Sequence, residues 1–409
     1  MKSLAAVAAL VLLALSVSSA VPPAKKKKAA TPALSQAALD EIEARATIGP
    51  SALENPAALV AFFEQVMHPP EGSNVHILQY GDSHTASDDW ANAMRLAFQA
   101  KFGNGGPGFA LAGHPFLGYR RFDVSGTSSP FWVTEGTAGH PGDGRFGLGG
   151  VSITSRRAND LVTFDAECDS LQLFYMTQPG GGDFVISVDG SPTQSVATDA
   201  PFAAAYLTYA AQPGPHRYSI RTTSAKPVRL FGWAADKQSG ISYETLGING
   251  AQAPMILDWD DAVFTSNMGL RKPALVVLQY GTNEALNPRF TVEGYQLQFA
   301  QVLAKIRGAA PLASILVVGP PDCLKALRPL PHIEEVIKIQ RTAAIAAGCA
   351  FWDWRARMGG LGSVKQWGLA GLGQADHIHL TGPGYRLTAA MLFQDLMRQY
   401  DRYVAVRSE

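Results

Sequence analysis

The chain is poor in cysteine and has no excess of charge of either sign. Only three of its 409 residues are cysteines, Cys168, Cys323 and Cys349, too few for a fold that depends on disulfide bonds. Cys323 follows one expected strand and Cys349 precedes another, so their thiols would lie at opposite ends of a parallel sheet; we expect all three to be free. The 34 basic and 34 acidic residues cancel, which argues against a protein that binds nucleic acid through clustered Lys and Arg.

The start of the chain is typical of an exported protein. Residues 1–20 combine Lys2, an apolar stretch and small residues at 18–20, the pattern of a secretory signal. The apolar stretch is too short and poorly flanked to predict a membrane span. Residues 21–33 contain prolines and four consecutive lysines and cannot bury a core, so we expect a flexible tether. Its lysines are either solvated or in contact with an anionic surface. These features predict a periplasmic or secreted protein without stable membrane insertion.

The remaining chain alternates between strand and helix patterns, in two stretches separated along the sequence. Short apolar runs predict strands, and each is followed by a segment with apolar residues at helical spacing. Such alternation indicates a parallel sheet covered by helices on both faces. The sequence therefore predicts a three-layer α/β/α domain with a five-stranded parallel sheet. The expected strands are residues 75–80, 241–248, 274–280, 314–319 and 350–354.

A segment of different character, residues 119–237, interrupts this pattern. It is rich in Gly, Thr and Ser, and its short alternating runs include a turn at Asp189-Gly190 that is typical of a β-hairpin. We expect an antiparallel β-sandwich inserted into the α/β domain. The insert would divide that domain into residues 34–118 and 238–409.

Three segments supply the groups that acyl transfer from an ester requires. Ser83 lies on a tight turn directly after the first expected strand, where its hydroxyl can act as a nucleophile. Asp376 precedes His379 by three residues, so the carboxylate can orient an imidazole that serves as the base. Asn283 and Gly250 follow the third and second strands and, with the Ser83 N–H, can donate hydrogen bonds to an oxyanion. Gly250 is expected to open a helix whose dipole favours negative charge.

Other interpretations of these residues stay open. The serine can cap a helix, the asparagine can form an Asx-turn, and the glycine can simply reverse the chain. His377 and His379 can be a structural, surface-exposed pair, or they can form a metal site with Asp376, although no spacing typical of zinc ligands accompanies them. The glycine-rich residues 103–113 are expected to form a loop near the site. Agreement among distant segments favours the acyl-transfer interpretation.

The order of these motifs resembles that of the SGNH (GDSL-like) hydrolase superfamily. The resemblance implies a flavodoxin-like fold without a metal or other cofactor, and Ser83 as the nucleophile. It also implies that Asp376 and His379 complete the triad and that Gly250 and Asn283 supply oxyanion donors. The matching motifs are Gly81-Asp82-Ser83, Gly247 to Gly250, Gly281-Thr282-Asn283 and Asp376 to His379.

Within the superfamily, the chain is most similar to exported peptidoglycan O-acetylesterases. The similarity rests on Gly-Asp-Ser-His at residues 81–84, Gly-Ile-Asn-Gly-Ala at residues 247–251, and a β-sandwich inserted between them, which resembles a carbohydrate-binding module. His84 and Glu284 depart from the commonest pattern, in which Leu and Asp are usual, and these departures bear on subfamily. The resemblance implies an acetylated wall glycan as substrate.

Rival functions use the same residues differently. An O-acyltransferase would pass the acyl group to another sugar hydroxyl, a lipid esterase would need a long acyl channel, and a wall-glycan-binding protein would need no catalysis. Trp352, Trp354 and Trp367 either stack on sugar rings or pack in the core.

Overall fold

The computed structural model describes residues 34–69 and 71–407; the predicted signal and tether lie outside the described residues. A six-stranded sheet has the order β1-β16-β13-β12-β2-β11. Five neighbouring strands are parallel, but β1 is antiparallel to β16, so the sheet is mixed and six-stranded rather than the five-stranded parallel sheet that the sequence predicts. The strands are β1 (Leu53–Glu54), β2 (Asn74–Gly81), β11 (Gly240–Gly247), β12 (Leu275–Gln279), β13 (Ser314–Val318) and β16 (Ala350–Trp352).

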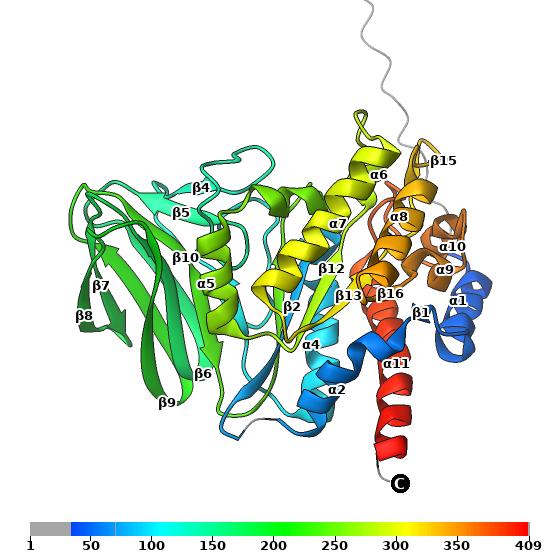
Figure 1. The fold of residues 1–409 in the computed structure, drawn as a ribbon, viewed down its shortest axis with the longest axis horizontal. Coiled ribbons are helices and arrows are strands. Elements are labelled where there is room, and N and C mark those ends of the chain that lie inside the picture. The colour runs from blue at the N-terminus through cyan, green and yellow to red at the C-terminus, as the bar shows by residue number, and fades with distance from the viewer. Residues whose placement is uncertain (1–33, 70, 408–409) are drawn as a thin grey trace, which may run out of the picture. The chain divides into compact units, whose positions relative to one another are not determined.

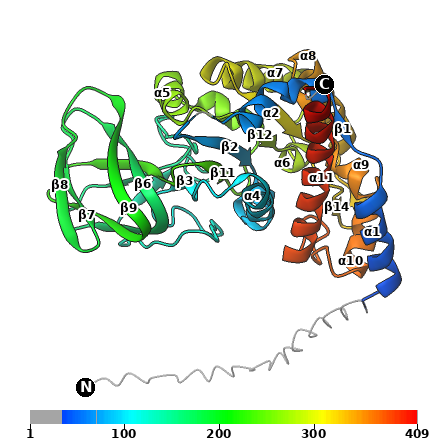
Figure 2. The same cartoon turned by 90° about the horizontal axis from the view of Figure 1, so that it is seen from below.

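Helices cover both faces of this sheet (Figures 1 and 2). Alternate strand residues enter two different cores: Leu78 packs in one cluster and Ile77 in the other. Burial on both faces explains why β12 and β13 are nearly continuous apolar runs. One face packs against α5 (Asp261–Arg271), α7 (Val292–Ala309) and α8 (Ile333–Ala346), and the other against α1 (Gln36–Ile48), α2 (Val60–Met67), α4 (Asp89–Phe102) and α11 (Gly382–Arg407).

Short elements connect these layers. None of the helices among the described residues is both long and apolar enough to cross a membrane. The short helices are η1 (Pro56–Leu59), α3 (Ser83–Ala86), η2 (Ala253–Asp258), α6 (Thr282–Ala285), α9 (Trp354–Met358) and α10 (Ser363–Leu369), and β14 (Leu324–Lys325) pairs with β15 (Arg328–Pro329).

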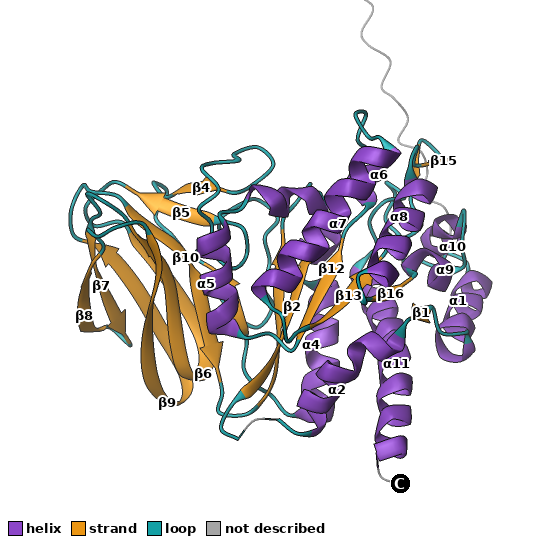
Figure 3. Cartoon of the chain, viewed as in Figure 1, coloured by secondary structure: helices purple, strands orange, loops and turns teal. Residues whose placement is uncertain are grey.

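The strands of the interrupting segment, together with β3 from the chain before it, form a second, antiparallel sheet (Figure 3). They are hydrogen-bonded along one path, β4-β5-β10-β6-β9-β7-β8, with β3 paired to β10, rather than in two separate sheets. The predicted turn at Asp189-Gly190 joins β7 and β8, and both residues have positive φ. The strands are β3 (Gly108–Leu111), β4 (Val133–Glu135), β5 (Ser152–Ser155), β6 (Leu161–Thr177), β7 (Asp183–Val188), β8 (Ser191–Ala197), β9 (Ala203–Thr222) and β10 (Val228–Asp236).

The two sheets share buried contacts. Phe109 and Phe174 of the antiparallel sheet belong to the same hydrophobic cluster as Leu78 of the parallel sheet. The glycine-rich residues 103–113 are not a single loop, because residues 108–111 form β3. Gly105 N donates to Ile241 O at the amino end of β11, and β3 follows directly, because this segment feeds the antiparallel sheet.

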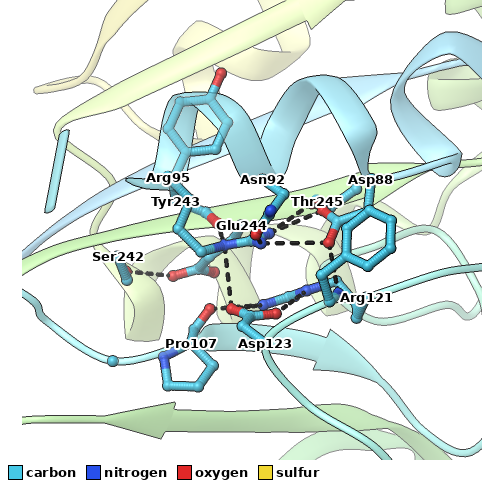
Figure 4. A network of polar contacts seen from close by, with 12 residues as sticks. Asp88, Asn92, Arg95, Pro107, Arg121, Asp123, Ser242, Tyr243, Glu244 and Thr245 are labelled. Carbon is cyan, nitrogen blue, oxygen red and sulfur yellow. Dashed lines mark hydrogen bonds and ion pairs between the residues drawn. The ribbon is translucent and has the colours of Figure 1, made fainter. Parts of the chain in front are cut away.

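A buried polar network joins α4 and β11 to the chain entering the antiparallel sheet (Figure 4). Arg95 of α4 is 1% exposed; it donates to Asp88 at 2.9 Å and to the Tyr243 carbonyl at 2.9 Å. Its guanidinium also lies 3.1 Å from Asp123, which pairs with Arg121 at 2.9 Å. Since a buried charge is costly unless it is paired, these contacts fix the segment around residue 121 against the α/β layers.

Candidate active site

The strand β2 places Ser83 at the carboxyl edge of the parallel sheet. Asp82 caps the following helix α3, because its Oδ1 accepts a hydrogen bond from the His84 backbone N–H at 2.9 Å. Gly81 permits this turn, since a Cβ there would lie 2.0 Å from Thr85 Oγ1. The Ser83 side chain is therefore half-buried at the first position of a one-turn helix.

The loop between α10 and α11 brings His379 and Asp376 to Ser83. Ser83 Oγ lies 2.9 Å from His379 Nε2, and His379 Nδ1 lies 2.7 Å from Asp376 Oδ2. Asp376 Oδ1 also accepts from the backbone N–H groups of Ile378 and His379, at 2.9 and 3.0 Å. Burial opposes ionisation of this carboxyl, but these hydrogen bonds hold the pKa of Asp376 below its usual value. The carboxylate thus fixes one ring nitrogen and leaves the other facing the serine.

The two predicted oxyanion donors follow β11 and β12, the strands on either side of β2. Asn283 is in α6, and its Nδ2 donates to Ala251 O at 3.0 Å and lies 3.5 Å from Asp82 Oδ2, beside the residue that precedes the serine. Gly250 is exposed with φ +75° and follows β11. The expectation that Gly250 opens a helix is wrong, because η2 is a 3₁₀ helix that begins only at Ala253.

Glu284 has a structural position behind the site. Its Oε1 accepts from the Ala253 N–H at 2.8 Å, which ties the end of β12 to the start of η2. Burial raises the pKa of Glu284 to about 7 and that of Asp82 to about 8, and the charge of Glu284 adds to the increase at Asp82. Glu284, which stands where aspartate is usual, therefore supports the loop that carries Gly250.

His84 packs against His379, the histidine that contacts Ser83. Its Nδ1 is 2.8 Å from Tyr385 Oη and its Nε2 is 3.2 Å from Thr282 Oγ1, while its ring centroid lies 5.2 Å from that of His379. Burial, with a smaller contribution from His379, lowers the pKa of His84 to about 3. His84 is thus a neutral, hydrogen-bonded support for the His379 ring.

This neutrality predicts a pH-dependent contribution to stability. His84 binds a proton below pH 6.5 in the unfolded chain but only near pH 3 in the folded one, so its contribution is complete above pH 6.5 and is lost as the pH falls toward 3. As the pH falls from 6.5 toward 3, the free energy of unfolding of the wild type should decrease relative to that of His84→Gln. The expected decrease is about 1 kcal/mol for each pH unit. Urea unfolding at a series of pH values measures it. Exposed His68→Gln is the control, and a pH-independent difference for His84→Gln would contradict the prediction.

The three tryptophans for which sugar stacking is the alternative are core residues. Trp352, Trp354 and Trp367 are each 0% exposed, so the packing interpretation is confirmed and sugar stacking is wrong. The three cysteines are buried and free of disulfide bonds. Among residues 34–69 and 71–407, no three His, Cys, Asp or Glu side chains are grouped to hold a metal ion.

A turn from outside the sequence motifs also reaches the site. The Leu117 carbonyl accepts from Asn249 Nδ2 at 2.9 Å, beside Gly250, and Arg120 N donates to the Ala86 carbonyl at 3.3 Å, at the end of α3. No local pattern predicts these contacts, because their partners lie far away in the sequence.

Comparisons with known proteins bear on the family and the fold. A model of the GDSL-like lipase/acylhydrolase family matches residues 209–387, which include His379 but begin after Ser83. A solved peptidoglycan O-acetylesterase aligns with a TM-score of 0.74 and 25% identity, over 86% of this chain and 99% of that one. No curated protein sequence matches the chain.

Two further solved structures align weakly and support no argument. A family two carbohydrate esterase from Clostridium thermocellum has a TM-score of 0.30 at 10% identity, over 67% of this chain and 98% of that one. A lipase/acylhydrolase from Enterococcus faecalis has a TM-score of 0.31 at 19% identity, over 40% of this chain and 77% of that one.

The α/β fold and the acylhydrolase match define a carboxylic ester hydrolase. Residues 209–387 match the GDSL-like lipase/acylhydrolase family, and the chain resembles a solved peptidoglycan O-acetylesterase.

Proposed function

We propose that this esterase removes O-acetyl groups from a cell-wall glycan, with peptidoglycan as the substrate. The observation that carries the proposal is the continuous hydrogen-bonded chain from Ser83 Oγ through His379 to Asp376, with contacts of 2.9 and 2.7 Å. The similarity to a peptidoglycan O-acetylesterase over 99% of that chain supports the choice of substrate.

In the proposed reaction, Ser83 Oγ attacks the acetyl carbonyl while His379 Nε2 accepts the serine proton. The carbonyl oxygen becomes negative and receives hydrogen bonds from the Ser83 and Gly250 backbone N–H groups and from Asn283 Nδ2. His379 then gives its proton to the departing sugar oxygen, which leaves an acetyl-serine. A water molecule, deprotonated by His379, attacks this ester, and acetate leaves as the serine recovers its proton. Asp376 stabilises the imidazolium throughout.

The proposal places the enzyme outside the cytosol. An acetylated wall glycan lies there, and the signal pattern in residues 1–20 supports export to the periplasm or medium. In this scheme, residues 34–118 and 238–409 form the catalytic domain, and residues 119–237 form an inserted module.

Acetate release separates this function from its rivals. The purified protein is expected to release more acetate from O-acetylated peptidoglycan than from acetylated xylan, and to prefer acetyl over octanoyl chromogenic esters. Both measurements should be repeated with an acceptor oligosaccharide present. Acetylated acceptor in place of acetate would identify a transferase, preference for octanoyl would identify a lipid esterase, and no turnover at all would indicate a binding protein.

A further inference from the structure

One exposed apolar side chain is held rigidly beside the site. Leu117 is 94% exposed, and it lies in a tight turn closed by a hydrogen bond from Tyr119 N to the Phe116 carbonyl at 3.2 Å. Gly118 has φ +87°, the conformation that a type II turn requires at its third position. Tyr119 is buried and Phe116 packs against the main core, with their rings 5.5 Å apart. The flanks of the turn are therefore fixed while its tip faces solvent.

The turn is bonded to the loop that carries Gly250 and to the end of α3. Asn249 Nδ2 donates to the Leu117 carbonyl, and a Cβ at Gly118 would come within 2.6 Å of the same Nδ2 atom, so the fit is close. On the other side, the hydrogen bond from Arg120 N reaches Ala86, the last residue of the helix that begins with Ser83. Leu117 and Arg120 thus lie at the carboxyl edge of the parallel sheet, near the end of β11 and near α3.

Two arginines, Arg120 and Arg386, lie near the turn that carries Leu117. The Arg120 side chain is 62% exposed and lies 3.9 Å from Asp89 Oδ2. Arg386 is exposed as well, and it acts electrostatically on the same carboxyl. A Cβ at Gly382, three residues beyond His379, would lie 3.0 Å from Asp89 Oδ1 and 3.2 Å from an Arg386 guanidinium nitrogen. Two guanidinium groups therefore share one carboxylate, which leaves a net positive rim.

We infer that Leu117 and Arg120 form a subsite for the glycan that carries the acyl group, and that this subsite selects acidic glycans. Leu117 contacts the apolar face of a sugar ring, and Arg120, with Arg386, pairs with a carboxylate of the same glycan. The inference rests on the proposed function and adds the class of glycan, a carboxylate-bearing one, together with the residues that recognise it.

The test compares Leu117→Ser and Arg120→Gln with Leu312→Ser, a control at an 81% exposed leucine that precedes β13 at the opposite edge of the sheet. The readout is the ratio of kcat/KM on O-acetylated peptidoglycan fragments to kcat/KM on a chromogenic acetyl ester. Each subsite variant is expected to lower this ratio about tenfold, mainly by raising KM on the glycan. The control should keep the wild-type ratio, and thermal unfolding verifies that all variants fold.

The same variants are also assayed on a neutral acetylated oligosaccharide. Arg120→Gln should impair the carboxylate-bearing glycan more than the neutral one, and added salt should reduce the difference. Equal losses on both glycans would overturn selection by charge. Wild-type ratios in both subsite variants would overturn the subsite while leaving the proposed function intact. No acetate release from peptidoglycan by the wild type would overturn the proposed function and the inference together.

Discussion

Ser83→Ala is expected to lower kcat for an acetyl ester by about 10⁴-fold or more, because it removes the oxygen that forms the acyl-enzyme. The fold should survive this change. The helix cap comes from the Asp82 side chain, which bonds to the His84 N–H, and alanine is a strong helix former. Acetate release and the urea unfolding midpoint, measured on the same preparation, test both expectations.

Ser87→Ala is the matched control for this variant. Ser87 is half-buried at the other end of α3, and its Oγ lies 3.5 Å from the His84 carbonyl. Its loss should change kcat less than about twofold, because the Ser87 hydroxyl bonds to the His84 backbone carbonyl and not to His379. Turnover by Ser83→Ala close to that of the wild type would show that another group attacks the ester.

The parallel strands and the local parts of the site follow from short-range patterns in the sequence. Strands buried on both faces are apolar runs, so β2 and β12 are visible without the structure. Asp376 and His379 are three residues apart, and their 2.7 Å contact is a local property of one loop. The approach of Ser83 to His379, 296 residues away, follows from motif order and strand polarity rather than from any local pattern.

Other features depend on contacts between residues that are far apart in the sequence, which no local pattern predicts. Strand β1 has two residues, and its pairing with β16 lies within a stretch whose spacing indicates helix. The start of η2 at Ala253 depends on the Glu284 carboxylate, from a distant strand end. The turn around Leu117 lies at the site because Asn249, 132 residues later, holds its carbonyl. In each case, the partner is set by tertiary packing, which overrides or supplements local preference.

Arg95→Met is expected to lower the free energy of unfolding by about 3–5 kcal/mol, because it leaves a buried carboxylate without its partner. Arg95 and Asp88 side chains are 1% and 0% exposed and lie 2.9 Å apart. Urea unfolding at neutral pH measures the effect. Lys101→Met on the same helix is the control: its pair with Asp401 is exposed, so its loss should cost at most about 1 kcal/mol. Equal effects of the two variants would contradict the prediction.

Arg95→Met should also weaken the proposed subsite. Asp88 accepts a hydrogen bond from Phe122 N at 2.8 Å, and Arg95 contacts Asp123, so this network anchors the chain directly after Arg120. When Arg95 is lost, that chain gains freedom and the turn around Leu117 is held less firmly. Arg95→Met should therefore lower the glycan-to-small-ester ratio of kcat/KM even at temperatures where it remains folded. An unchanged ratio would show that Asn249 and the buried Tyr119 alone are sufficient to fix the turn.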